Sequence, residues 1–219
     1  ANIAVGDGTS ADDTLVYDEL LDTTGTGFMG RIQYDALKID LPIYHGTEDD
    51  TLLKGVGHLE GTSLPVGGTD TRSVLTAHRG LPEATLFNEL DKAKIGDTFT
   101  ISVLDEVLTY RVIETQVIEP DETEAILPVA GKDMVTLVTC TPLGINTHRI
   151  LVNAERITPT PQDDIDAALA DPELPGFPWW AVILGTLLAA AATYIWYAGR
   201  PRKPKGEATD TTSNAPSIP

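Results

Sequence analysis

The chain has 219 residues, 42% of them hydrophobic, and a formal net charge of −18. This length allows one domain with a proper core but not two large ones. The negative charge argues against a nucleic-acid-binding protein, because phosphate backbones are bound through Lys and Arg. The charge is uneven: residues 200–219 carry +2 and residues 1–176 carry −20. A body of this charge could attract cationic partners.

The chain contains one cysteine, Cys140, which rules out an intrachain disulfide. A lone cysteine in an exported protein is either a small buried hydrophobic residue or a reactive thiol. Composition alone favours the buried residue, so the local sequence must decide between the two.

In chain order, residues 1–28 come first as an N-terminal segment. They have neither the basic start nor the long apolar run of a signal peptide. If the C-terminal tail is cytoplasmic, we expect an export signal ahead of Ala1 in the precursor.

Residues 29–159 are predicted to form a mainly β domain. Short runs rich in Val, Ile, Thr and Tyr predict strands, and clusters of glycine and proline separate them. Leu86–Leu90 is predicted to form one helical turn. Many short strands at modest spacing favour a closed barrel or a sandwich. The predicted strands are Ile32–Ile43, Ser73–Ala77, Thr98–Leu104, Val107–Val117, Met134–Thr139 and Arg149–Ile157.

A transmembrane helix is predicted at residues 177–199. The 22 residues 177–198 carry no charge, and as a helix they could cross ~30 Å of hydrocarbon. Trp179–Trp180 lie at one edge and Trp196–Tyr197 at the other, which is typical of interfacial aromatic belts. Length, edge aromatics and the following basic residues favour a membrane span over a buried core helix.

The segments on either side of this span complete the predicted organisation. Residues 160–176 are a linker in which Asp163–Ala170 suits a short helix with an acidic start, stopped by Asp171-Pro172. The basic cluster Arg200–Lys205 predicts a cytoplasmic tail at residues 200–219 and an extracellular body. The linker would space that body from the bilayer.

The local sequence around Cys140 favours a reactive thiol. Cys140 ends the β-branched run Val135–Thr139, and Pro142 breaks the strand. At a strand terminus a side chain can face solvent and still be rigidly placed. To act as a nucleophile at neutral pH, the thiol needs a neighbour that takes its proton or stabilises its charge. Four histidines are candidates.

Among the histidines, His78 is the preferred partner because it also stands where an apolar strand ends. His45 and His58 adjoin glycines, and we interpret them as solvent-exposed or satisfied turn histidines. His148 precedes Arg149, and consecutive strand residues point to opposite faces. His148 therefore faces away if Arg149 faces the site.

Arg149 follows Cys140 by nine residues, a spacing that suits a loop between neighbouring strands. Its guanidinium could hold a thiolate or stabilise the oxyanion of a tetrahedral intermediate. From spacing alone, an ordinary surface arginine is an equal alternative. One cysteine and scattered histidines lack the ligand spacing of a zinc site, and we expect no metal and no cofactor.

The ordered motifs resemble the sortase family. Thr136–Cys140 is similar to the signature TLxTC, and Ala77–Gly80 and Asn146–Arg149 are similar to the family's histidine and arginine segments. The C-terminal span is typical of the pilus-assembling class C sortases, and the resemblance covers about residues 17–200. Further stretches that resemble class C are Leu41–Thr47, Gly55–Gly68 and Cys140–Asn146.

This resemblance implies an eight-stranded sortase-type β-barrel that cleaves an LPxTG-like sorting signal between Thr and Gly. Cys140 would form a thioester with the signal, and His78 would protonate the leaving amine. A lysine amine of a pilin would then resolve the thioester, with His78 as base. Arg149 would hold the oxyanion or a backbone carbonyl of the signal. Thr139 would line the groove beside Cys140.

The sequence departs from class C in its first residues. Class C enzymes commonly carry an N-terminal lid with an Asp-Pro-aromatic motif, and residues 1–28 contain no such motif. Tyr17–Leu21 resembles the segment just after the lid, so the lid either precedes Ala1 or is shortened. Leu143 also replaces the Tyr common after the Cys-Thr-Pro segment.

Two other functions remain open at this stage. One is a sortase that attaches proteins to the cell wall. The other is a non-catalytic, membrane-tethered surface module, which predicts an inert, buried Cys140. In all three cases we expect a single-pass membrane protein, and for the enzymes we expect precursors with LPxTG-like signals as partners.

Overall fold

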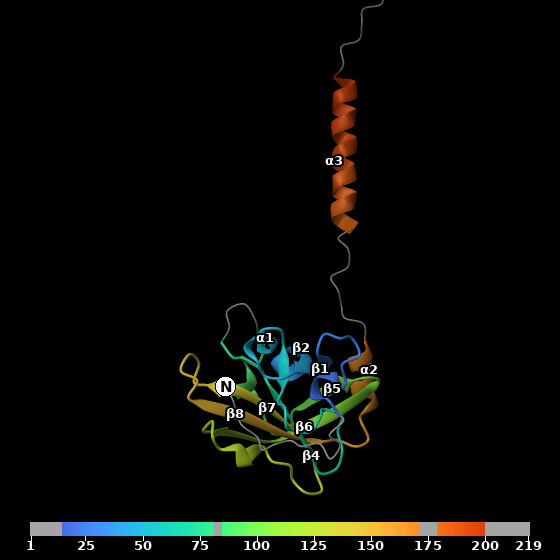
Figure 1. Ribbon diagram of the computed structural model, residues 1–219. Coiled ribbons are helices and arrows are strands. Elements are labelled where there is room, and N and C mark those ends of the chain that lie inside the picture. Colours follow the sequence, from blue (N-terminus) through green and yellow to red (C-terminus); the bar gives the residue numbers. More distant parts are fainter. Residues whose placement is uncertain (1–14, 81–84, 171–178, 200–219) are drawn as a thin grey trace, which may run out of the picture. The chain divides into compact units, whose positions relative to one another are not determined.

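The computed structural model describes residues 15–80, 85–170 and 179–199. Within these ranges, eight strands close into a barrel in the order β1-β2-β3-β4-β7-β8-β6-β5 (Figure 1). The pairs β2–β3 and β4–β7 are parallel, and the other neighbours are antiparallel. The strands are β1 (Phe28–Tyr34), β2 (Ile39–His45), β3 (Val56–His58), β4 (Thr71–Thr76), β5 (Thr98–Val103), β6 (Glu106–Ile118), β7 (Asp133–Thr141) and β8 (His148–Arg156).

Each strand contributes side chains to both the inside and the outside of the barrel, because successive side chains point to opposite faces. On β7, Val135 and Leu137 belong to the large apolar cluster inside the barrel. Val138 belongs to a second, smaller cluster, together with Val74 of β4 and Leu151 of β8. The outer face of β4, β7 and β8 is therefore also partly covered, and it is this face that carries the candidate site.

Short helices complete the barrel domain. They are α1 (Asp49–Leu52), α2 (Gln162–Leu169) and the 3-10 helices η1 (Tyr17–Glu19), η2 (Asp35–Leu37), η3 (Leu90–Lys92) and η4 (Thr123–Ile126). Helix α2 lies against β5 and β6 (Figure 1). Ile126 of η4 covers the second apolar cluster from outside.

The long helix α3 (Trp179–Ala198) belongs to a separate unit. Contacts within the chain define one unit at Ala1–Ala170 and another at Asp171–Pro219. Helix α3 has 20 residues, a mean hydropathy of 1.7 and no buried residue. By length and composition it could cross a membrane. The predicted start of the span at residues 177 and 178 and the cytoplasmic tail lie outside the described residues.

The predicted barrel is confirmed, and two predicted elements need correction. The run Ile32–Ile43 is not one strand but parts of β1 and β2, joined by η2 and by Lys38 at φ 55°. The turn predicted at Leu86–Leu90 is hydrogen-bonded, but the 3-10 helix begins at its last residue. Strand β3 was missed because its three residues are too short to show a period of two.

Candidate active site

Cys140 and Arg149 are brought together by the pairing of β7 with β8. In this antiparallel pair they are direct register partners, and partners of this kind project to the same face of the sheet. The connection between the strands spans residues 142–147, and the amides of Ile145 and Asn146 both donate to the carbonyl of Pro142. The predicted meeting of the two side chains at one end of the sheet is confirmed.

His78 reaches the same place from β4. The parallel pairing of β4 with β7 ends at Thr76 and Val138, but the amide of Ala77 still donates to the carbonyl of Val138 at 3.2 Å. Continued for two residues on each strand, this register sets His78 beside Cys140. Neighbouring strands lie about 4.8 Å apart, and residues separated by two positions share a face.

One cavity of about 210 Å³ joins the three predicted catalytic residues. His78, Cys140 and Arg149 all line it, with Asn146 and Thr47 as further polar neighbours. The rest of its wall is largely apolar and comes from strands β4 and β7 and from the segments around α1 and β3. These apolar residues are Leu52, Leu59, Val74, Ala77 and Val138.

The thiol of Cys140 and the imidazole of His78 have no polar partner among the described residues. Within the described ranges, no hydrogen bond or ion pair involves Sγ of Cys140 or the ring of His78. Cys140 is half-buried and open to the cavity, unlike a cysteine packed among core residues. Neither group is therefore committed to a partner in the described part of the chain, and both are open to a molecule bound in the cavity, as a thiol nucleophile and its base must be.

Arg149 combines a fixed position with unused donors. Its side chain is buried, and one guanidinium nitrogen, Nη1, donates to the carbonyls of Asn146 and His148, each at 2.9 Å. Nε and Nη2 have no partner in the described part of the chain, and neither is sealed from solvent. A rigid cation with donors facing a cavity can stabilise an oxyanion there.

Thr139 does not line the cavity. It is buried, and its hydroxyl donates to the carbonyl of Ala77 at 2.8 Å. This bond fastens the residue before His78 to the residue before Cys140. That Thr139 lines a substrate groove remains a prediction. Its hydrogen bond to Ala77 joins the ends of β4 and β7.

The remaining histidines lie apart from the thiol. His148 is exposed and paired with the hydroxyl of Thr147, as expected for a side chain opposite in direction to Arg149. His45 and His58 are satisfied, as predicted, but they are buried in the barrel wall rather than exposed in turns. The ring of His45 faces the carbonyls of Leu20 and Gly27 at 2.7 and 3.0 Å.

Sequence reasoning missed the cluster that His58 forms with the N-terminal segment. Nδ1 of His58 lies 2.9 Å from the hydroxyl of Tyr17, and its Nε2 lies 2.9 Å from the carbonyl of Ser63. The amide of Gly46 donates to the same hydroxyl. Burial lowers the pKa of His58 to about 4 and raises that of Tyr17 to about 12. Tyr17, at the start of the segment that resembles the one just after the lid, is thus an anchor on the barrel.

A second missed group of buried polar residues lies on the outer face of the sheet, further from the strand ends. Thr136 donates to Asn153 at 2.8 Å, and Asn153 donates to Glu114 at 2.9 Å. Arg72 is buried beside them, donates to the carbonyl of Ala125, and has its pKa lowered by burial. This contact holds η4 against the sheet. Among the described residues, no group of three or more His, Cys, Asp or Glu could hold a metal ion.

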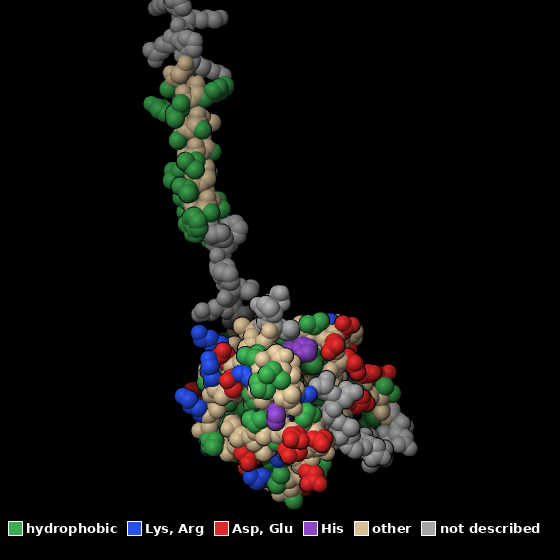
Figure 2. Space-filling model, turned by 90° about the vertical axis from the view of Figure 1, so that its left-hand side faces the viewer, with side chains coloured by type: hydrophobic (Ala, Val, Ile, Leu, Met, Phe, Trp, Pro, Cys, Tyr) green, Lys and Arg blue, Asp and Glu red, His purple; other side chains and the backbone are tan. Residues whose placement is uncertain are grey.

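The surface of the barrel domain carries many acidic side chains. On the face shown in Figure 2, histidine side chains reach the surface among hydrophobic and uncharged ones, acidic side chains gather to their right and below them, and basic side chains lie along the left edge. This distribution agrees with the negative net charge of the body.

A closed mixed barrel with a cysteine, a histidine and an arginine around one cavity defines a class of cysteine-dependent acyl-transfer protein. Residues 32–157 match the sortase domain. Because this match covers more than half of the sequence, the chain belongs to the sortase family, whose members are cysteine transpeptidases.

Individual relatives are sortases, and the solved structures among them are named sortase C. Sortase D of Bacillus subtilis is 28% identical over 59% of this chain, and the chain spans 64% of that protein. The crystal structure of sortase C-1 from Actinomyces oris is 50% identical with a TM-score of 0.62, covering 64% of this chain and 79% of that one. The pilus-related sortase C of Group B Streptococcus is 45% identical with a TM-score of 0.59, covering 60% and 68%.

Proposed function

We propose that this chain is a cysteine transpeptidase that cleaves an LPxTG-like sorting signal and joins its acyl part to a lysine amine of a pilin. The observation that carries the proposal is the shared cavity of His78, Cys140 and Arg149. The class C relatives, one of them described as pilus-related, support the pilin as partner.

The reaction would run in two acyl transfers. His78 takes the thiol proton of Cys140, Sγ attacks the carbonyl carbon of the signal's Thr, the C–N bond to Gly breaks, and His78 passes that proton to the leaving amine. A neutral lysine amine then attacks the thioester, His78 takes the amine proton, the C–S bond breaks, and His78 returns the proton to Sγ. An isopeptide bond and a free thiol remain.

Arg149 would serve both transfers by stabilising the negative charge on the carbonyl oxygen. Its Nη1 atom is held by two backbone carbonyls, so the guanidinium is positioned before substrate binds. Donors fixed in advance lose little free energy to reorganisation when the charge develops.

The proposed placement is extracellular for the barrel domain, residues 29–159, with residues 160–176 as linker and 177–199 as membrane anchor. The apolar character of α3 supports an anchor, and the basic residues after it support a cytoplasmic tail. An extracellular site would meet exported precursors of pilins or other surface proteins.

The test is cleavage of an LPxTG-like peptide by the full chain in detergent micelles, with a pilin-derived peptide that contains a lysine as acceptor. We expect cleavage between Thr and Gly, and mass spectrometry should detect a product in which the two peptides are joined through the lysine side chain. Transfer only to a cell-wall-type amine would favour an anchoring sortase. Undiminished cleavage of the peptide by the Cys140→Ala variant would contradict the proposal.

A further inference from the structure

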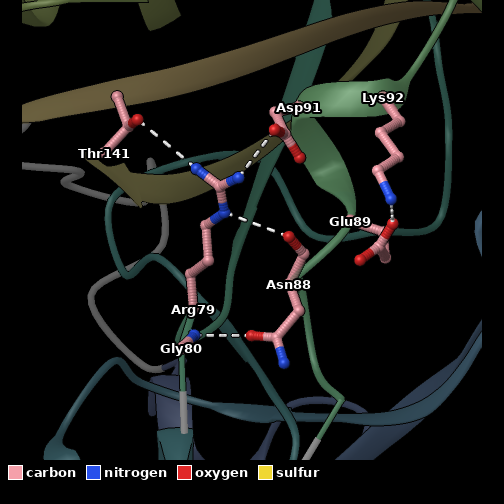
Figure 3. Close-up of polar contacts among 7 residues, drawn as sticks. All are labelled: Arg79, Gly80, Asn88, Glu89, Asp91, Lys92 and Thr141. Carbon is pink, nitrogen blue, oxygen red and sulfur yellow. Dashed lines mark hydrogen bonds and ion pairs between the residues drawn. The ribbon is translucent and has the colours of Figure 1, made fainter. Parts of the chain in front are cut away.

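A polar cluster centred on Arg79 lies immediately after His78 (Figure 3). The guanidinium makes three contacts in three directions. Nε donates to the carbonyl of Asn88 at 3.0 Å, Nη1 donates to the hydroxyl of Thr141 at 3.3 Å, and Nη2 forms an ion pair with Asp91 at 2.8 Å. The side chain of Arg79 is only 8% exposed.

The segments joined by this cluster are the ones that carry the proposed thiol and base. Thr141 is the last residue of β7 and follows Cys140 directly. Asn88 and Asp91 belong to the turn and to η3, which together lie beside the segment after β4. Arg79 therefore ties the His78 segment to the end of the Cys140 strand and to a third element.

The direction of the side chains places this tie behind the site. Consecutive residues of an extended chain point to opposite faces, so Arg79 turns away from the cavity when His78 lines it. The same holds for Thr141 relative to Cys140. Neither Arg79 nor Thr141 lines the cavity. Their contact thus prolongs the parallel register by one pair on the side away from the reacting atoms.

Other hydrogen bonds also hold the short segment around His78. Arg79 supplies a hydrogen bond that links the part of this segment after His78 to β7. Before His78, the segment is fastened to β7 by the amide of Ala77 and by the hydroxyl of Thr139. After it, the amide of Gly80 donates to the side chain of Asn88 at 2.5 Å, which holds the turn but not β7 (Figure 3).

We infer that Arg79 is a positioning residue, which keeps the imidazole of His78 in register with the thiol of Cys140 by clamping the chain behind them. This inference rests on the proposed function, because it assigns Arg79 a part in the same reaction. A planar guanidinium can donate to a hydroxyl, a carbonyl and a carboxylate at once, whereas a lysine ammonium is a single point of charge. Lysine is therefore expected to replace it only in part.

The experiment compares Arg79→Gln and Arg79→Lys with wild type, in the full chain in detergent micelles. For peptide cleavage we expect Arg79→Gln to lower kcat about tenfold with KM within twofold, since a small displacement of a catalytic group is costly. Arg79→Lys should recover part of the loss. A general structural defect would raise KM and lower the melting temperature without this ordered recovery.

A second readout follows the thiol alone. The rate of Cys140 alkylation by iodoacetamide is measured against pH, and we expect Arg79→Gln to be alkylated more slowly than wild type near neutral pH, because a displaced His78 is less able to take the thiol proton. An alkylation profile and a kcat both equal to those of wild type would overturn the inference.

Matched controls separate this inference from a folding effect and from failure of the proposed function. Arg31→Gln removes the two-bonded pair with Asp40 on β1 and β2, across the barrel from β7, and should change neither readout. If Arg79→Gln does not fold, Thr141→Val removes only the accepting hydroxyl, and an unchanged kcat there would count against the clamp. A wild-type chain that cleaves no peptide contradicts the proposed function, while the alkylation profile still tests Arg79.

Discussion

Two histidine clusters in the same barrel wall differ in how their hydrogen bonds are used. Both ring nitrogens of His58 face protein oxygens, and the ring is completely buried. The ring of His78 makes no hydrogen bond within the described ranges and lines a cavity with Cys140 and Arg149. Both histidines stand at strand ends, so strand position alone does not distinguish them.

The difference shows how a fold separates stability from chemistry. A buried polar cluster in which every group has a partner matters for stability, since removing one partner leaves a buried donor or acceptor unpaired. A cluster with unused donors at a cavity contributes little to stability but can bind and exchange protons. We therefore expect substitutions at the cavity to change rates and substitutions at the buried cluster to change stability.

The largest effect is expected at the thiol. Cys140→Ala should abolish cleavage of an LPxTG-like peptide, because no other residue can form the thioester. The melting temperature should stay close to that of wild type, since the cysteine is half-buried and has no polar partner. Peptide mass spectrometry and circular dichroism measure the two. Turnover near that of wild type would contradict the view that the cavity cluster carries the reaction and the buried cluster carries stability.

Arg149→Ala should lower kcat/KM by roughly 10² or more, as for other lost oxyanion donors. The carbonyls of Asn146 and His148 that it now holds can turn to water, so the loss of stability should be small by comparison. Steady-state kinetics on the same peptide provide the measurement. A fall in melting temperature large enough to explain the loss of rate would mean that Arg149 acts on stability rather than on the reaction.

His58 should make stability depend on pH. Burial lowers its pKa to about 4, against an ordinary value of 6.5, so between these values the unfolded chain binds the extra proton and the folded chain does not. Stability is therefore lost as pH falls from about 7 to 4, by about 3 kcal/mol in total. Denaturant unfolding at several pH values should show this slope in wild type and not in His58→Gln, in which Tyr17 and His45 are retained.

Tyr17→Phe is the smallest and most selective change. It removes the hydroxyl that contacts His58 and Gly46 and leaves the ring in place, so a loss of about 1 kcal/mol in the free energy of unfolding is expected. The kcat of peptide cleavage should not change. A marked fall in kcat at constant stability would mean that the N-terminal segment acts on the cavity after all.

Some features of the site could be read from local sequence. The β-branched run before Cys140 and Pro142 after it predicted a thiol at a strand end, and β7 ends at Thr141. The spacing of nine positions from Cys140 to Arg149 predicted neighbouring strands, and the two are register partners. Such patterns are visible because strand alternation and proline act over a few residues.

Other features depended on contacts between distant segments. The burial of His58 arises from Tyr17, which lies 41 positions earlier. The contact of Thr139 with Ala77 and that of Arg79 with Thr141 each cross 62 positions. No local pattern marks these residues, because a threonine or an arginine looks the same in the sequence whether its side chain faces solvent or a partner across the barrel.

By itself the sequence determined the mainly β class and the apolar C-terminal helix, and it predicted the three residues of the candidate site, since these follow from composition, period and short motifs. Only the tertiary structure decided which histidine is sealed and which is open. That choice depends on how a parallel pairing of β4 with β7 and an antiparallel pairing of β7 with β8 bring three strand ends together, and long-range register of this kind is set by packing of the whole barrel.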